Sequence, residues 1–369
     1  MPGFNGYWQP GRRDGRRIAV LACTGLLALF AFVTVPGCGG SGPPSEKRLV
    51  ILINGEDPFW DAVRAGMNQA ASDLNVRAVM EVNDATPEGQ INKLRQFASQ
   101  SGIAAVAISA TDAANAAIVD AMRNLQRRGI HVITIDSDID RNQYHDARSA
   151  FVGTDNLAGG RELGRAVRQL VPEGGTYVTF VGRTGAQNAI ERVGGFAEGA
   201  GEGFTRVDNM GDENARDRAR ENVRTAIRNH PDLRVLVGIW AYNAPAIVDV
   251  VRDMQVRDRF QIAVFDADSQ AIEAMGAGDI DVMLIQNPYE MGYQSVRMLK
   301  ALVDDDQEAI RQMFPQWGEP DGEIYDTGLR IVVPDEGSPL DASLFGEQTE
   351  FFRLGEFRAW LEQHGLRSS

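Results

Sequence analysis

Cysteine and histidine are both scarce in this chain of 369 residues. There are two cysteines, Cys23 and Cys38, and four histidines that lie far apart in the sequence. A structural zinc site needs several such ligands at short spacings. The sequence therefore predicts no metal site.

A glycine-rich phosphate-binding turn is also missing. After the first apolar strand the chain reads Ile53-Asn54-Gly55-Glu56-Asp57-Pro58, without the G-x-G-x-x-G pattern that opens a dinucleotide-binding helix. We expect no cofactor, and we do not expect an enzyme.

Basic residues are fewer than acidic ones. The chain has 37 Lys and Arg against 51 Asp and Glu, which gives a net charge of −14. A strongly acidic protein is repelled by the phosphate backbone, so we do not expect nucleic acid as a partner. Net charge says little about a neutral ligand.

The first residues of the chain run against this acidic composition. Four arginines within residues 12–17 precede an uncharged apolar stretch, residues 18–35, which ends at Pro36-Gly37-Cys38. This order resembles the leader of a bacterial lipoprotein, in which the cysteine after a small residue is acylated and becomes the new N-terminus. An uncleaved anchor helix is the alternative, because a run of this length can just span a bilayer.

A lipoprotein leader would leave a mature chain that begins at Cys38. Cys23 would be removed with residues 1–37, so no disulfide could form, and loss of the leader's net charge of +3 would take the body from −14 to −17. Residues 38–47 are rich in glycine, serine and proline, as in a flexible tether. The leader predicts a protein held by lipid on the periplasmic side of the cell envelope.

The body alternates between short apolar strands and amphipathic helices. The strands predicted by apolar runs are 49–53, 78–82, 104–108, 131–135, 176–181, 205–209, 235–239 and 262–265. Strands that are apolar throughout are buried on both faces, and helical connections make them parallel. A second series of alternating strands and helices begins at Thr176, so we predict an α/β fold of two doubly wound parallel-sheet lobes.

Polar and aromatic residues follow these strands at their carboxyl ends, where open parallel sheets bind ligands. They lie at 54–60, Asp136, 242–243, Asp266 and 286–288. Carboxylates and amides can each engage two neighbouring hydroxyls, and aromatic faces cover the C–H faces of a sugar ring. An Asp after a strand can also be a turn residue or a helix N-cap, and for Asp136 or Asp266 alone this alternative stays open.

An ordered series of segments resembles the ribose-binding type of periplasmic sugar-binding protein, the receptor of an ABC importer. The segments are DPFW, VITID, NAIERVGGF, NHPDL, YNAPAI, VFDAD and IQNPYEMGYQS. The resemblance runs over residues 48–333. It implies a type I periplasmic binding protein with a three-crossing hinge, which as a monomer binds a monosaccharide or cyclic polyol between its lobes and delivers it to an ABC permease.

Two other functions share parts of this pattern. A sugar-responsive repressor has a similar two-lobed core, but it needs a basic DNA-reading headpiece where this chain has the apolar leader. A sugar-sensing receptor for a chemotaxis or signalling partner stays open, because the sequence does not separate sensing from transport.

The resemblance implies ligand-binding residues, carried over segment by segment. Phe59 and Trp60 fall on the family's ring-stacking aromatic pair, and Asp57 falls on the polar position beside it. The other positions that it implies are Asn54, Asp136, Asn243, Asp266 and Gln286.

Two positions depart from the family pattern. The family's ligand arginine falls on Ile190, so we expect that contact to be missing and Asn188 to substitute for it. A third aromatic falls on Asn214, with Trp240 and Tyr242 as candidate replacements. An aliphatic Ile190 would leave a polar ligand atom unsatisfied, so we expect ribose to bind poorly and a six-membered ring to bind better.

The family topology also implies where the lobes begin and end. The N-terminal lobe would comprise residues 48–154 plus 287–327, and the C-terminal lobe 155–286 plus 328–334. Beyond Pro334, apolar residues from Phe351 to Leu361 recur at near-helical spacing. The tail, residues 335–369, is therefore predicted to add an amphipathic helix that packs on a lobe.

Overall fold

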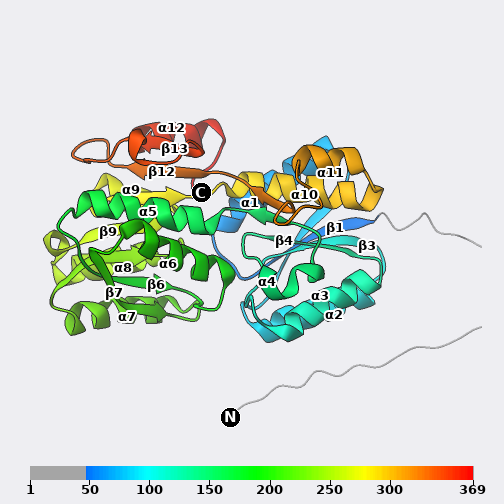
Figure 1. Ribbon diagram of the computed structural model, residues 1–369, viewed down its shortest axis with the longest axis horizontal. Coiled ribbons are helices and arrows are strands. Elements are labelled where there is room, and N and C mark those ends of the chain that lie inside the picture. Colours follow the sequence, from blue (N-terminus) through cyan, green and yellow to red (C-terminus); the bar gives the residue numbers. More distant parts are fainter. Residues whose placement is uncertain (1–46, 369) are drawn as a thin grey trace, which may run out of the picture. The chain divides into compact units, whose positions relative to one another are not determined.

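Two separate sheets, each covered by helices on both faces, organise the computed structural model of the chain (Figure 1). The structure describes residues 47–368. The predicted leader, Cys38 and the tether up to residue 46 lie outside the described residues. Within the described part, no helix is both long and apolar enough to cross a membrane.

The first sheet is parallel throughout, with the strand order β11-β5-β4-β3-β1-β2. Its strands are β1 (Arg48–Ile53), β2 (Arg77–Val82), β3 (Ile103–Ile108), β4 (His131–Ile135), β5 (Phe151–Gly153) and β11 (Ile324–Asp326). The helices around it are α1 (Phe59–Asp73), α2 (Pro87–Ser99), α3 (Ala116–Arg127), α4 (Arg141–Tyr144), α10 (Pro288–Asp304) and α11 (Gln307–Met313).

The second sheet has the order β13-β12-β10-β9-β8-β6-β7, in which only the β10–β12 pair is antiparallel. Its strands are β6 (Gly175–Val181), β7 (Phe204–Gly211), β8 (Leu233–Gly238), β9 (Gln261–Phe265), β10 (Val282–Ile285), β12 (Leu329–Val333) and β13 (Thr349–Arg353). Its helices are α5 (Asn156–Leu170), α6 (Gln187–Ala200), α7 (Arg216–Asn229), α8 (Asn243–Met254), α9 (Ser269–Gly276) and α12 (Leu354–Gln363).

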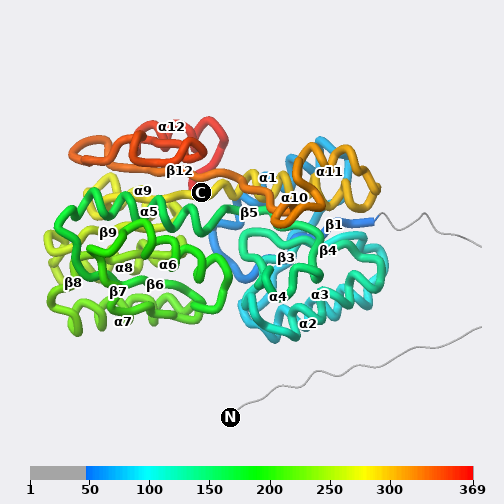
Figure 2. Tube along the Cα trace, viewed as in Figure 1, coloured from blue at the N-terminus to red at the C-terminus, as the bar shows by residue number. Residues whose placement is uncertain are grey.

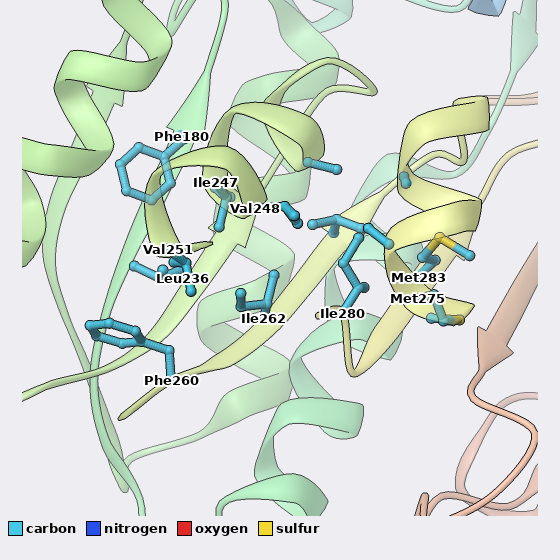
Figure 3. Close-up of a cluster of buried hydrophobic side chains, with 14 of the residues drawn as sticks. Phe180, Leu236, Ile247, Val248, Val251, Phe260, Ile262, Met275, Ile280 and Met283 are labelled. Carbon is cyan, nitrogen blue, oxygen red and sulfur yellow. The ribbon is translucent and has the colours of Figure 1, made fainter. Parts of the chain in front are cut away.

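Successive residues of the central strands pack into different cores. In β1, Leu49 and Ile51 join the cluster that includes residues of α1 and α10, whereas Val50 and Leu52 join the cluster that includes residues of α2 and α3. The second sheet repeats this arrangement, and Figure 3 shows one of its two clusters, in which Leu236 and Ile262 lie near α8. The prediction of two doubly wound lobes from uniformly apolar strands is confirmed.

The chain passes between the two sheets three times, after β5, after β10 and after β11. These three crossings form the hinge of the fold. The finer lobe boundaries, at 154/155, 286/287 and 327/328, stay a proposal.

Glycines bring α5 and α6 into backbone contact. Gly160 and Gly164 of α5 face Gly195 and Gly199 of α6, and a Cβ at Gly160 would lie 2.4 Å from the carbonyl oxygen of Arg192. No larger residue fits there without moving a helix. The close packing fixes α6, which carries two residues of the site described below.

The tail differs from its predicted form. Phe351 and Phe352 belong to β13, which pairs in parallel with β12 and extends the second sheet, and only from Leu354 onward is the chain helical. Figure 2 shows the red C-terminal segment folded back along β12. Leu354, Phe357 and Leu361 of α12 join the apolar cluster of that sheet. The sequence predicted the helix but not the strand.

Candidate functional site

A cavity of about 120 Å³ lies at the carboxyl ends of strands from both sheets. Every ligand-binding residue predicted from the sequence lines it, except Asn243. This volume is well above the roughly 10–15 Å³ that a single water needs, so the cavity has room for a small ligand.

The loop between β1 and α1 forms the first wall. Phe59 and Trp60 are buried at the start of α1 with their rings edge to face, 5.1 Å apart. Asp57 precedes them and accepts a hydrogen bond from the Phe59 N–H at 3.0 Å, which ties its carboxylate to the loop. Burial raises the pKa of Asp57. Asn54 completes this wall.

Two carboxylates, Asp136 and Asp266, lie at corresponding places in the two sheets. Each is the first residue after its strand, and each has a left-handed backbone, with φ of 61° and 66°. The Asp136 N–H donates to Val152 O at 3.1 Å, and the Asp266 N–H donates to Leu284 O at 2.7 Å. A left-handed backbone is uncommon outside glycine, and here it accompanies a side chain that lines the cavity.

Hydrogen bonds hold both carboxylates in place. Asp136 accepts from the Ser109 hydroxyl at 3.1 Å and from Asn188 Nδ2 of α6 at 3.5 Å. Asp266 accepts from Gln286 Nε2 at 2.9 Å. Burial raises the pKa of both carboxyls, that of Asp266 to about 6, against the opposing effect of the positive charge on Arg192.

Arg192 is the most deeply buried of the site residues that the sequence did not predict. It is buried in α6, with its guanidinium above the Phe265 ring and Nη1 3.6 Å from Asp266 Oδ2. Nε donates to Asn156 at 2.8 Å and Nη1 donates to Ile239 O at 2.9 Å, while Nη2 has no hydrogen-bond partner among the described residues. A buried N–H group without a partner is uncommon in native proteins.

The sequence predicted a missing arginine contact at Ile190, with Asn188 as its substitute, but Arg192, two residues further along, brings an arginine into the lining. Ile190 is 51% exposed and does not line the cavity. Asn188 and Arg192 are four residues apart on α6, so they lie on the same face of the helix. Ile190, two residues from each, lies on a different face. Helical spacing from Asn188 was the signal that would have found Arg192.

Asn243 also differs from its predicted role. It is fully buried at the start of α8, where Nδ2 donates to Asp212 at 3.1 Å and Oδ1 accepts from the Trp240 N–H at 3.0 Å. Both polar ends are used within the protein, so Asn243 supports the loop that carries Trp240 and Tyr242. Those two aromatic residues line the cavity.

The more exposed rim of the cavity carries charges from both lobes. Arg216, at the start of α7, is half-exposed and lies 3.7 Å from Asp57 and over the Tyr242 ring. Glu56 and Asn214 also line this side. Sequence reasoning did not select Arg216, because it stands in a strongly charged helix where arginines are usually solvent-facing.

The site is built for binding. It combines hydrogen-bonding side chains and flat aromatic surfaces on opposite walls. Within residues 47–368, no cluster of three or more His, Cys, Asp or Glu side chains is placed to hold a metal ion.

Comparison with known proteins agrees with the fold. Residues 49–307 match the periplasmic binding protein domain. The chain is 21% identical over 294 residues to the ribose import binding protein of Escherichia coli K12, covering 79% of this chain and 95% of the relative. It is 25% identical over 275 residues to the D-apiose import binding protein of Paraburkholderia graminis, covering 73% and 83%.

A solved structure shows the same fold. The solute-binding protein of an ABC transporter from Burkholderia graminis C4D1M, in complex with D-arabinose, aligns with a TM-score of 0.70 at 22% identity, over 80% of this chain and 97% of that one.

This chain belongs to the periplasmic binding protein family. The predicted resemblance to the ribose-binding type, and the type I fold that it implies, are confirmed. The family is one of binding proteins rather than enzymes, as expected from the sequence.

Proposed function

We propose that this protein is an extracytoplasmic receptor that binds a monosaccharide or cyclic polyol in the cavity and delivers it to an ABC import permease. Ligand would contact both lobes at once, because the cavity takes side chains from each. Closure of the lobes around it would then report an occupied receptor to the permease.

One observation carries the proposal: acceptors, donors and aromatic faces surround a single cavity that takes side chains from both lobes. Asp136 and Asp266 supply acceptors for ligand hydroxyls, and the free Nη2 of Arg192 supplies a donor for a ring or hydroxyl oxygen. Phe59 and Trp60 on one side and Trp240 on another offer apolar surface for C–H faces. Two relatives are named as import binding proteins for ribose and for D-apiose, which supports the same ligand class.

Poor binding of ribose, which was predicted from Ile190, is not part of this proposal. Ile190 is exposed and does not line the cavity, whereas Arg192 lines it and can donate to a ligand oxygen. Pentoses and hexoses are therefore equal candidates.

Thermal unfolding of residues 47–369 with a panel of pentoses, hexoses and inositols tests the proposal. A ligand at a hundred times its dissociation constant should add roughly 2.7 kcal/mol to the free energy of unfolding. If no sugar or polyol raises the melting temperature, the proposed ligand class is wrong.

We also propose that Cys38 anchors the receptor by lipid on the periplasmic side of the cell envelope. The order of charge, apolar run and cysteine in residues 12–38 supports it. Labelled palmitate should enter the wild-type protein and not the Cys38→Ser variant. Equal labelling of both would reject the anchor.

The permease partner can be tested separately from the ligand. Affinity capture of the sugar-loaded receptor from its own membranes should recover an ABC permease. Recovery of a chemotaxis or sensor protein instead would favour the signalling alternative.

A further inference from the structure

An open hollow adjoins the cavity on the first lobe. It lies over the end of β2 and the first turns of α2, has a volume of about 800 Å³, and shares Gly55, Glu56 and Ala85 with the lining of the cavity. A ring bound in the cavity would thus have unfilled space beside it on one side.

The partition between the two spaces consists of very small side chains. Gly55 and Ala85 face each other so closely that a Cβ at Gly55 would lie 3.1 Å from the Ala85 Cβ. Ala85 has a left-handed backbone, with φ of 60°, and its N–H donates to Asn83 Oδ1 at 2.6 Å. A non-glycine residue held in this conformation is strained. Because neither Gly55 nor Ala85 has a side chain longer than a methyl group, little separates the cavity from the hollow at this point.

The hollow is lined by polar groups. Asn92 and Gln96 are exposed on successive turns of α2, and Lys93 lies between them with its ammonium 3.1 Å from Glu81. Asn83 is 8% exposed, and its Nδ2 has no hydrogen-bond partner among the described residues. Amides and charged groups that can each bond a hydroxyl suit a polyhydroxylated ligand.

We propose that this hollow is a second subsite, which takes a sugar residue linked to the ring in the cavity. The receptor would then bind disaccharides as well as monosaccharides. The subsite rests on the proposed function, because it has meaning only if a sugar ring occupies the cavity. The linkage would pass over Gly55 and Ala85, and the second residue would meet Asn92 and Gln96.

Calorimetry with two sets of sugars tests the subsite. The first set is D-glucose, D-galactose, D-allose and D-arabinose; the second is cellobiose, maltose, melibiose and lactose. We expect at least one disaccharide to bind. Its affinity should fall about fivefold for each hydrogen bond lost in Asn92→Ala/Gln96→Ala. It should fall at least tenfold in Asn92→Trp, which places a bulky ring where the second sugar residue would meet α2, while monosaccharide affinity stays within twofold.

Asn68→Trp is the matched control, because Asn68 is an exposed asparagine on α1 that does not line the hollow. Monosaccharide binding without disaccharide binding would overturn the subsite and leave the proposed function intact. Disaccharide binding that the α2 variants do not weaken would also overturn it. If neither set binds, and no member of the panel of pentoses, hexoses and inositols binds either, the proposed function falls and the subsite with it.

Discussion

Asp136 in the first lobe and Asp266 in the second occupy corresponding places but have different partners. Both follow a central strand with a left-handed backbone, and both are buried. Asp266 has its cation, Arg192, in its own lobe, 3.6 Å away. Asp136 has a hydroxyl from its own lobe, Ser109, and otherwise depends on Asn188 of the other lobe.

The second lobe therefore carries a preformed half of the site, whereas the half on the first lobe is completed only when the lobes close. The second lobe holds a carboxylate, an arginine and an amide together through contacts within itself, so it can present them before any closure. The first lobe's carboxylate gains the α6 amide and the nearby Arg192 charge only when the lobes meet. We therefore expect a sugar to bind first to the second lobe and to draw the first lobe onto it.

Removal of Arg192 should have the largest effect, because it faces both carboxylates. A hydrogen bond to a charged group is worth about 1.5–3 kcal/mol, and the loss of Arg192 also leaves two buried carboxylates without their cation. Arg192→Met should therefore weaken sugar binding by roughly thirtyfold or more, measured by calorimetry. Arg192→Lys keeps the charge without the planar fork and should recover part of the loss. Ile190→Ala, on the exposed face of the same helix, is the control and should change affinity by less than twofold. If Ile190→Ala and Arg192→Met weaken sugar binding equally, Arg192 is not a ligand-binding residue.

The arginine also shows what the sequence could predict. The uniformly apolar strands and helical connections led to the two lobes. The residues after the strands led to part of the lining, including Asp136 and Asp266, whereas Asn188 came from the resemblance to the family. The sequence failed where a residue's role depends on the phase of a helix, as at Ile190 and Arg192. It failed again where a polar side chain is used inside the protein, as at Asn243, because a one-dimensional pattern does not show whether Asp212 lies within hydrogen-bonding distance.

Asp266 should also make stability depend on pH. Burial raises its pKa from an ordinary value near 3.8 to about 6 in the folded protein. Between these values the folded state keeps a proton that the unfolded state releases. The free energy of unfolding of the ligand-free protein should therefore fall as pH rises from 4 to 7, by up to roughly 2–3 kcal/mol from this group.

Urea unfolding at pH 4, 5.5 and 7 checks this slope. Asp266→Asn should make the slope shallower, whatever the variant's absolute stability, because other buried carboxyls such as Asp212 keep a raised pKa. Asp217→Asn, on the exposed start of α7, should leave the slope unchanged. A variant slope equal to that of the wild type would show that Asp266 ionises in the folded protein as it does in the unfolded chain.

Each carboxylate should matter to binding on its own. Loss of one acceptor leaves ligand hydroxyls unpaired at a cost of about 1–3 kcal/mol, so Asp136→Ala and Asp266→Ala should each weaken binding by roughly 5- to 150-fold. The double variant should lose less than the sum of both, because the two residues share Arg192. Wild-type affinity in both single variants would mean that they are turn residues only.

The smallest effect should come from a contact between the lobes that does not line the cavity. Arg141 of α4 in the first lobe donates to Glu191 of α6 in the second at 2.9 Å, and Gln187 donates to the same carboxylate at 2.8 Å. Such a contact stabilises the closed arrangement whatever the ligand. Because apparent affinity scales with the population of the closed state, Glu191→Ala should weaken every ligand by the same factor, about two- to fivefold for an ion pair near the surface.

Glu198→Ala is the matched control for this contact. Glu198 lies on the same helix, but its ion pair with Arg161, at 2.6 Å, stays within the second lobe. It should leave affinity unchanged. Solution scattering of the ligand-free proteins should give a larger radius of gyration for the Glu191 variant than for the Glu198 variant, and saturating sugar should bring the two together. A loss confined to one sugar would mean that Glu191 touches the ligand, and equal behaviour of the two variants would mean that the lobes close without this contact.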